Sequence, residues 1–591
     1  MIPDTLEISS IHTAYREGSL TPALLAEELL RRIAAYPDKA VFISLVPQAE
    51  VLAAAQALDI SNIEKLPLFG IPFVVKDNID VFGMPTTAAC PEFSYMPKQD
   101  ATVISKLREA GAILLGKTNL DQFATGLNGT RSPYGAPRSV FNADYISGGS
   151  SSGSAVAVGA GLAVFSLGTD TAGSGRVPAA FNNVIGLKPS IGRISTHGVV
   201  PACKSLDCVA ILTNSVMDAM KVLHVAEGFD AADAYSRPPR DIALQMTPRV
   251  GILKSKDRDF FGDEAAADLY AKAISQAESL GWELVEIDYA PFREIAATLY
   301  GGAFVAERFT AIRSFFESHE EALNPVVRGI IGGAQKISAA DAFADIYRVQ
   351  ALRQRAMAVL ETCDTLLLPT APTIFTVAQM LEEPVARNSM LGLYTNFVNL
   401  LDLAAVALPA GFRPDGLPFG VTLIGPAFSE ASLAVYASAL HEALGAGAGK
   451  SKTPVQTPLP PLVADEITVV VAGAHLSGMA LNHELCALDA RLVAAAKTAP
   501  DYKLFALATT PPKPGLVRAP GFVGDGIAVE VWALTPENFG RFVARLPEPM
   551  GIGKIMLADG TIHPGFLCEA YALEGAKDIT AFGGWRVYLK S

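Results

Sequence analysis

The sequence predicts an α/β fold: a large domain whose central β-sheet is covered by helices, followed by a small α+β barrel-like domain. Short apolar runs typical of buried strands alternate with amphipathic segments at helical spacing, which favours helices layered around a sheet. Half of the 591 residues are hydrophobic and 18% are charged, which is enough apolar material for a sizeable core. A change of composition near residue 445 separates the small domain.

The expected elements of the large domain follow one another in β-α alternation. Thr21 and Pro22 begin a helix, with the threonine as N-cap and the proline in the first turn. The alternation predicts strands at 41–46, 73–75, 112–115, 250–253 and 365–368, and helices at 103–110, 263–280 and 340–362. One helical pattern also covers residues 297–317.

The chain is expected to divide into domains at 1–445 and 466–591, joined by a linker at 446–465. The linker is rich in Gly, Pro and Thr and lacks helical or strand periodicity. The second domain is expected to contain one helix near 482–497 and β-rich runs at 467–471, 505–508, 527–532 and 586–589.

Charge, the N-terminal sequence and cysteine content argue against a nucleic-acid-binding, membrane-spanning or metal-binding protein. The formal net charge is −13 and no run of basic residues occurs, which disfavours nucleic acid as a partner. We expect no signal peptide, no membrane span and a cytoplasmic protein, because the N-terminus lacks a basic start followed by an apolar segment. The six cysteines form no CxxC pair, so we expect reduced thiols, no metal site and no cofactor.

Two clusters of Gly and Ser, at 148–154 and 168–175, are the most informative stretch of the sequence. Such clusters let backbone amides crowd around a reacting atom and bring hydroxyls together without side-chain bulk. Lys76 follows the apolar run 73–75. It either extends to the surface or lies buried, where desolvation would lower its pKa and make it a usable base. Asp77 could supply a charge that works against that shift.

These segments together resemble the amidase signature family of serine hydrolases over about residues 5–445. The motifs that carry the resemblance are GIPFVVKDN, GGSSSGSA and the glycine-flanked serine of GTDTAGSGR, in that order. The resemblance implies a mixed central sheet and a catalytic triad in which Ser174 is the nucleophile, Ser150 relays its proton and Lys76 is the base. It also implies that the Gly149–Ser150 peptide bond is cis.

The chemistry of the triad agrees with elementary principles. A serine hydroxyl needs an adjacent base, and none of the eight histidines lies in a hydrolase motif. The backbone N–H groups of Thr171, Ala172 and Gly173 are candidates for an oxyanion hole. The sequence departs from the family's usual pattern at Ala172 and Ser152, where glycine is common, but both side chains are small.

Within that family the whole chain is similar to the allophanate hydrolases. GVVPACKSLDCVAILT, LYGGAFVAERF and the C-terminal AGAHLSGMALN carry this similarity. It implies hydrolysis of allophanate, a small anion, to ammonia and carbon dioxide in urea or triazine breakdown, by a cytoplasmic homodimer coupled to a separate urea carboxylase. It also implies that Tyr300 and Arg308 bind the substrate carboxylate. Eight residues apart, they fall on roughly one side of a helix, although a solvated arginine is the plainer interpretation of the spacing alone.

The same similarity implies a gamma-glutamylcyclotransferase-like fold for the C-terminal domain, with a role in decarboxylating N-carboxycarbamate. His475, with Ser477 and Asn482 nearby, is the candidate site, although a lone histidine in a turn is more often structural. Glu530 and Glu569 are candidates for cyclotransferase chemistry, for which no clear residue set is present.

Three alternatives to an allophanate-hydrolysing enzyme stay open from the sequence. The first is an amidase for neutral aliphatic amides. The second is the amidase component of a tRNA-dependent amidotransferase, which fits poorly with the acidic charge and the added C-terminal domain. The third is an inactive amidase scaffold used for binding, which the intact Lys76, Ser150 and Ser174 argue against.

Overall fold

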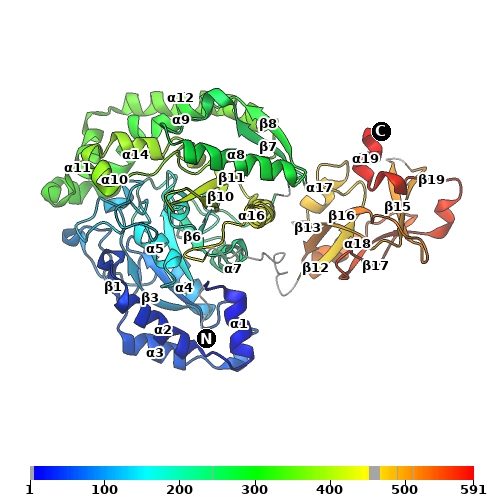
Figure 1. Cartoon of the computed structure of the whole chain (residues 1–591), viewed down its shortest axis with the longest axis horizontal. Helices are drawn as coiled ribbons and strands as arrows, with labels where there is room; N and C mark the ends of the chain where they lie inside the picture. The colour runs from blue at the N-terminus through cyan, green and yellow to red at the C-terminus, as the bar shows by residue number, and fades with distance from the viewer. Residues whose placement is uncertain (1–4, 243, 246, 452–465, 489, 510–511) are drawn as a thin grey trace. The chain divides into compact units, whose positions relative to one another are not determined.

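The structure, a computed structural model of the chain, describes residues 5–242, 244–245, 247–451, 466–488, 490–509 and 512–591. The chain divides into two compact units: Met1–Pro239 with Arg249–Thr457, and Arg240–Pro248 with Pro458–Ser591. Residues 452–465 of the predicted linker lie outside the described residues. Figure 1 shows the elements of both units, coloured along the chain.

The first unit is built on one mixed sheet, in which the described residues form eleven strands. Their spatial order is β1 (Phe42–Leu45), β3 (Ile113–Thr118), β2 (Pro72–Lys76), β4 (Phe165–Asp170), β6 (Cys208–Thr213), β5 (Ile185–Lys188), β10 (Leu403–Phe412), β11 (Pro418–Pro426), β9 (Thr365–Pro369), β7 (Arg249–Leu253) and β8 (Glu283–Ile287). The pairs β3–β2, β2–β4, β9–β7 and β7–β8 are parallel, and the other pairs are antiparallel.

Helices surround this sheet. They are α1 (Ile8–Arg16), α2 (Pro22–Ala35), α3 (Gln48–Gln56), α4 (Thr102–Glu109), α5 (Ser152–Gly159), α6 (Arg176–Phe181), α7 (Val216–Ala226), α8 (Glu264–Ser279), α9 (Ala290–Gly301), α10 (Phe304–His319), α11 (Pro325–Gly332), α12 (Ala339–Leu360), α13 (Val377–Glu382), α14 (Ala386–Leu391), α15 (Phe397–Leu400) and α16 (Glu430–Leu444). Helices α4, α7, α16 and α8 pack in a row, whereas α5 and α6 pack on each other and on the central strands.

Local sequence accounts for the elements near the Gly/Ser clusters. Every residue of α5 is buried, and its small side chains let it pack closely on the central strands β2, β3 and β4. Thr21 caps α2 as predicted, accepting a hydrogen bond from the Leu24 N–H at 3.3 Å.

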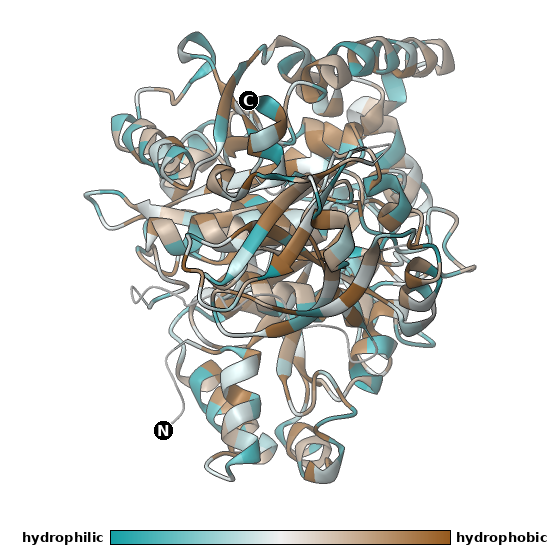
Figure 2. Ribbon diagram, turned by 90° about the vertical axis from the view of Figure 1, so that its right-hand side faces the viewer, coloured by the Kyte–Doolittle hydropathy of each residue, from teal (hydrophilic) through white to brown (hydrophobic). Residues whose placement is uncertain are grey.

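In Figure 2 the helical ribbons carry both teal and brown residues, as expected of helices with one face on the core and one toward solvent. The large domain of the predicted fold class is confirmed.

The second unit is β-rich, as predicted, and its described strands form two sheets. The five-stranded sheet has the order β13 (Arg491–Lys497), β16 (Ala528–Leu534), β12 (Ile467–Val471), β18 (Ile562–Cys568) and β17 (Met550–Met556). The three-stranded sheet consists of β15 (Lys513–Arg518), β14 (Tyr502–Leu507) and β19 (Lys577–Asp578). The helices are α17 (Asn482–Cys486), α18 (Pro536–Val543) and α19 (Trp585–Lys590).

Two expectations for the second unit are wrong. The helix predicted at 482–497 is only the short α17, and residues 491–497 form β13, whose first four residues are buried. The run at 586–589, predicted as a strand, lies in α19. The runs 492–496 and 586–589 are short and mainly apolar, and such runs do not distinguish a strand from a short helix without their packing partners.

Among the described residues, no helix is both long enough and apolar enough to span a lipid bilayer.

Candidate active site

Lys76 is the last residue of β2, a strand in which every residue is buried. Its side chain is fully buried, so the interpretation that it extends to the surface is wrong. Its Nζ donates to Ser150 Oγ at 2.8 Å and to Thr169 Oγ1 at 2.6 Å. The tertiary structure therefore brings the predicted base and the predicted relay serine into direct contact. Thr169, which the sequence analysis did not identify, completes the contacts of the amine.

Burial makes Lys76 a base near neutral pH. Desolvation lowers the pKa of its ammonium to about 7. The carboxylates of Asp121, Asp207 and Asp170 raise this pKa, and the Arg308 guanidinium lowers it. The amine is thus available in its neutral form around pH 7, as general base catalysis requires.

Asp77, the residue next in sequence, does not pair with Lys76. Its carboxylate lies 2.9 Å from Lys117 Nζ in a fully buried ion pair and accepts hydrogen bonds from the N–H and hydroxyl of Thr87. The sequence did not decide whether the Asp77 carboxylate would act on Lys76; in the structure it pairs with Lys117 instead. Lys76 stays without an adjacent carboxylate partner among the described residues.

The two predicted serines lie on adjoining loops. Ser150 precedes α5, and the Gly149–Ser150 peptide bond is cis. Ser174 lies between β4 and α6 and is 2% exposed. The Ser151 N–H donates to the Ser174 carbonyl at 3.1 Å, which joins the two loops. Within the described ranges the Ser174 hydroxyl has no hydrogen-bond partner, so it remains available to a substrate.

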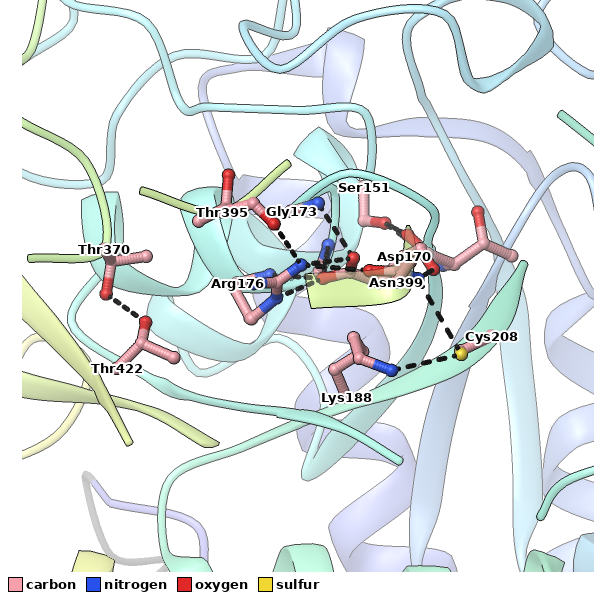
Figure 3. A network of polar contacts seen from close by, with 12 residues as sticks. Ser151, Asp170, Gly173, Arg176, Lys188, Cys208, Thr370, Thr395, Asn399 and Thr422 are labelled. Atoms are coloured by element: carbon pink, nitrogen blue, oxygen red, sulfur yellow. Dashed lines mark hydrogen bonds and ion pairs between the residues drawn. The ribbon is translucent and has the colours of Figure 1, made fainter. Parts of the chain in front are cut away.

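The loop that carries Ser174 is held by a buried ion pair, shown in Figure 3. Asp170 receives two hydrogen bonds of 2.9 Å from the Arg176 guanidinium and others from the N–H groups of Gly173 at 2.8 Å and Gly175 at 3.1 Å. Burial alone would raise the pKa of Asp170, but the Arg176 guanidinium and these donors hold it below its usual value. Asn399 donates to the Asp170 carbonyl at 2.8 Å. The sequence analysis did not identify Asp170, Arg176 or Asn399.

The predicted oxyanion donors differ in availability. The Gly173 N–H is engaged with the Asp170 carboxylate. The N–H groups of Thr171, Ala172 and Ser174 donate to no protein group among the described residues. These three amides are therefore free to face a ligand.

Tyr300 and Arg308 meet, but not on one helix. The predicted helix at 297–317 is interrupted at Gly302, so Tyr300 lies near the end of α9 and Arg308 in α10. Arg308 Nη2 nevertheless donates to the Tyr300 hydroxyl at 3.3 Å, and its guanidinium lies 5.0 Å from the centre of the Tyr300 ring. The solvated interpretation of Arg308 is also wrong, because the residue is only 2% exposed.

Arg308 has no carboxylate in direct contact among the described residues. Its other donor contacts are Thr125 Oγ1 at 3.2 Å and the Ala124 carbonyl at 3.4 Å. Its Nε is buried without a hydrogen bond, and no carboxylate of the described chain lies within ion-pair distance. Burial opposes the charged form of Arg308, but Tyr300 and more distant groups such as Asp207 outweigh it, so its pKa is raised. A buried guanidinium without a carboxylate is a site prepared for an anion.

A second buried arginine lies next to Tyr300. Arg131 donates to the carbonyls of Thr125 at 2.8 Å and Pro384 at 2.6 Å, and its Nε also lacks a partner. Arg131, Tyr300 and Asn388 line a cavity of about 380 Å³. Sequence reasoning missed Arg131, because an arginine that follows an Asn-Gly turn shows no periodicity that would predict its burial.

In the second unit His475 lines a small cavity of about 30 Å³ together with Lys513 and Phe566. Its Nε2 lies 2.8 Å from the Glu484 carboxylate, and its ring contacts Phe542 and Phe566. Burial lowers the pKa of His475, and Glu484 opposes this shift. Glu484 was not identified from the sequence.

The other candidates of this unit have structural contacts. Glu530, 1% exposed, accepts from the Ser477 N–H at 2.8 Å, from Trp532 Nε1 at 3.0 Å and from Arg586 at 2.9 Å. Asn482 donates to the His475 carbonyl at 3.1 Å. Glu569 is exposed.

Comparisons with known proteins agree with this fold. The family described as Amidase matches residues 25–434, so the chain belongs to the amidase family and is an amidohydrolase by class. A second family, described as Allophanate hydrolase C-terminal domain, matches residues 467–590. The chain thus combines an amidase domain with an allophanate hydrolase C-terminal domain.

Individual relatives cover one or both domains. The urea amidolyase of Lachancea kluyveri is 45% identical over 95% of this chain, which spans about a third (32%) of that relative's length. A glutamyl-tRNA(Gln) amidotransferase subunit from Exiguobacterium sibiricum is 34% identical over 74% of this chain and 97% of its own. The solved Kluyveromyces lactis allophanate hydrolase is 41% identical, with a TM-score of 0.78 over 100% of both chains.

Proposed function

We propose that this protein hydrolyses allophanate to ammonia and carbon dioxide, as a serine amidohydrolase of urea or triazine nitrogen metabolism. The observation that carries the proposal is the buried Arg308 guanidinium beside Tyr300, which has no carboxylate partner among the described residues. Allophanate bears one carboxylate at the end opposite its terminal amide, so an arginine fork suits it. The similarity to proteins named allophanate hydrolase and urea amidolyase supports this substrate.

The proposed reaction starts when Ser174 Oγ attacks the terminal carbonyl carbon. The hydroxyl proton passes through Ser150 to Lys76, whose Nζ already contacts Ser150 Oγ. The oxyanion is stabilised by the free N–H groups of Thr171, Ala172 and Ser174, rather than by Gly173, at about 3 kcal/mol for each well-placed donor.

The tetrahedral intermediate then collapses and expels the amide nitrogen, which takes the proton back from Lys76 and leaves as ammonia. Water, activated by the same base, hydrolyses the acyl-enzyme and releases N-carboxycarbamate. The Asp170–Arg176 pair keeps the nucleophile loop in place during both steps.

The experiment that tests this function is ammonia release from allophanate by the purified protein. Rapid release supports the proposal. Turnover of neutral amides without allophanate would instead favour an aliphatic amidase. Copurification with tRNA or with a partner protein would favour an amidotransferase role, for which the similarity to a glutamyl-tRNA(Gln) amidotransferase subunit gives some ground.

The proposed base predicts an acidic limb in the pH profile. Lys76 acts as its neutral amine, and its pKa of about 7 lies below that of a free lysine. As the pH falls below 7 the amine becomes protonated, so kcat/KM should fall about tenfold per pH unit and level off above pH 8. Initial rates between pH 5.5 and 9, corrected for spontaneous hydrolysis, check this. A flat profile across pH 7 would contradict the assignment of Lys76.

We also propose that the second unit promotes decarboxylation of N-carboxycarbamate at His475. The support is the contact of His475 with Glu484 and the cation Lys513 on the same cavity. Imidazole can deliver the proton that replaces the lost carboxyl group, and Lys513 suits an anionic ligand. Carbamate then decomposes to ammonia and carbon dioxide.

Replacing His475 by alanine should leave the first ammonia release unchanged and slow carbon dioxide release about 10²-fold or more. Stopped-flow detection of each product checks this, with His563→Ala as the matched control, because His563 is a half-buried histidine of β18 in the same unit. Equal rates of both products in the His475 variant would show that the histidine is structural.

The remaining assignments follow from this function. The proposed substrate enters through the cavity lined by Arg131 and Tyr300, because the positive charge there attracts an anion. A homodimer, a cytoplasmic location and coupling to a separate urea carboxylase stay part of the proposal. The proposed domain boundaries, 1–445 for the amidase domain and 466–591 for the C-terminal domain, also stay part of the proposal.

A further inference from the structure

We propose that Asp121 is a positioning residue of the active site: it supports the backbone that presents Ser150, and its carboxylate acts on Lys76 through space without touching it. This inference rests on the proposed role of Lys76 as the base. Asp121 lies three residues beyond the end of β3 and is fully buried.

The carboxylate of Asp121 is held by backbone groups alone. It accepts hydrogen bonds from the N–H groups of Asn128 at 3.2 Å, Gly129 at 3.0 Å and Arg131 at 3.0 Å. No cation lies within ion-pair distance of it in the described part of the chain. Backbone donors stabilise a carboxylate in its ionised form. Three backbone N–H groups thus take the place of a salt bridge at the Asp121 carboxylate.

The carboxylate also lies against the loop that carries the relay serine. A Cβ added to Gly149 would overlap with Asp121 Oδ2, so the glycine is needed for this close approach. The Asp121 N–H donates to the Ser150 carbonyl at 3.2 Å. Both the side chain and the backbone of Asp121 thus contact the Gly149–Ser150 segment, whose hydroxyl contacts Lys76 at 2.8 Å.

Asp121 is the strongest of the charged groups that act on Lys76. The others are Asp207 and Asp170, which also favour the ammonium, and Arg308, which disfavours it. Asp170 is neutralised by its ion pair with Arg176. Asp207 accepts hydrogen bonds from Thr171 and from backbone N–H groups, and burial raises its own pKa to about 6. Removing the charge of Asp121 should therefore change the basicity of Lys76 most.

The test compares Asp121→Asn with wild type by the rate at which a small fluorophosphonate labels Ser174 between pH 5 and 9. Without the carboxylate, the Lys76 ammonium loses stabilisation and deprotonates at lower pH. We expect the acidic limb to move down by about one pH unit. Labelling would then fall about twofold between pH 8 and pH 6, instead of about tenfold in wild type.

Two variants separate the charge from the loop contact. Asp121→Glu retains the carboxylate. The acidic limb of its labelling profile should therefore stay within a few tenths of a pH unit of wild type, even if labelling is slower overall. Asp38→Asn is the matched control. Asp38 also accepts hydrogen bonds from two backbone N–H groups, of Ala40 at 3.0 Å and Arg138 at 2.8 Å, but does not act on Lys76. The acidic limb of the labelling profile of Asp38→Asn should coincide with that of wild type.

An Asp121→Asn limb that coincides with that of wild type would overturn the inference, whatever the change in rate. If this variant does not fold, as judged by thermal unfolding, Asp121→Ser replaces it in the same comparison. Failure of the proposed function is distinguishable. In that case wild type releases no ammonia from allophanate, or Lys76→Ala labels as fast as wild type, before Asp121 is changed at all.

Discussion

Replacing Ser174 by alanine should reduce ammonia release from allophanate by about four orders of magnitude or more. The hydroxyl is the only group that forms the acyl bond in the proposed reaction, and its loop is held in place by Asp170 independently of the side chain. Removal of the hydroxyl should therefore leave the fold intact. Ammonia release by purified wild type and variant, measured beside their thermal unfolding, checks this.

Ser154→Ala is the matched control for Ser174→Ala. Ser154 is a fully buried serine of α5 whose hydroxyl contacts Thr118 at 2.8 Å and the Leu167 carbonyl at 3.1 Å. Its replacement should lower the free energy of unfolding by about 1 kcal/mol and leave the catalytic rate within a few-fold of wild type. Full activity in Ser174→Ala, or labelling of another serine by a fluorophosphonate, would contradict the assignment of the nucleophile.

Replacing Arg308 by methionine should lower kcat/KM for allophanate about 10²- to 10³-fold, mainly through KM. The guanidinium is buried and has no carboxylate partner among the described residues, so it is free to form a charged hydrogen-bonded pair with the substrate. Methionine fills similar space without the charge. Turnover of allophanate and of a neutral amide, with the rate of Ser174 labelling at pH 8, checks this.

The expected pattern for Arg308→Met is specific to anions. Turnover of the neutral amide and labelling of Ser174 should stay within a few-fold of wild type. Arg313→Met, on the same helix but in an exposed pair with Glu317, should change neither substrate. An equal loss on the anionic and neutral substrates would show that Arg308 acts only by supporting α10.

The fold was largely predictable because its signals are local. Apolar runs such as 73–75 and 365–368 are buried strands in the structure, and the capped helix after Thr21 begins where its sequence indicates. The predictions that failed, at 482–497 and 586–589, depend on the short and mainly apolar runs 492–496 and 586–589 of the second unit. There the choice between helix and strand depends on which residues pack against them.

The active site was predictable in its residue types but not in its contacts. Lys76 and Ser150 were expected to act together, and the structure joins them. That Asp77 would pair with Lys117 rather than Lys76 depends on the parallel register of β2 with β3. Tyr300 and Arg308 meet, but the single helix expected at 297–317 is wrong, because a break at Gly302 separates α9 from α10.

By itself, then, the sequence determined the α/β class and the two-domain organisation, because apolar runs and turn-rich stretches express local requirements of the backbone. The residues proposed for the triad came from the resemblance of its motifs to the amidase signature family. Only the tertiary structure decided which charges meet. It brings Asp121 against Gly149, leaves Arg131 and Arg308 buried without carboxylates, and places Glu484 on His475. These contacts join segments from different parts of the fold. The strength of an electrostatic interaction depends on distance and burial, and neither can be predicted from a local sequence pattern.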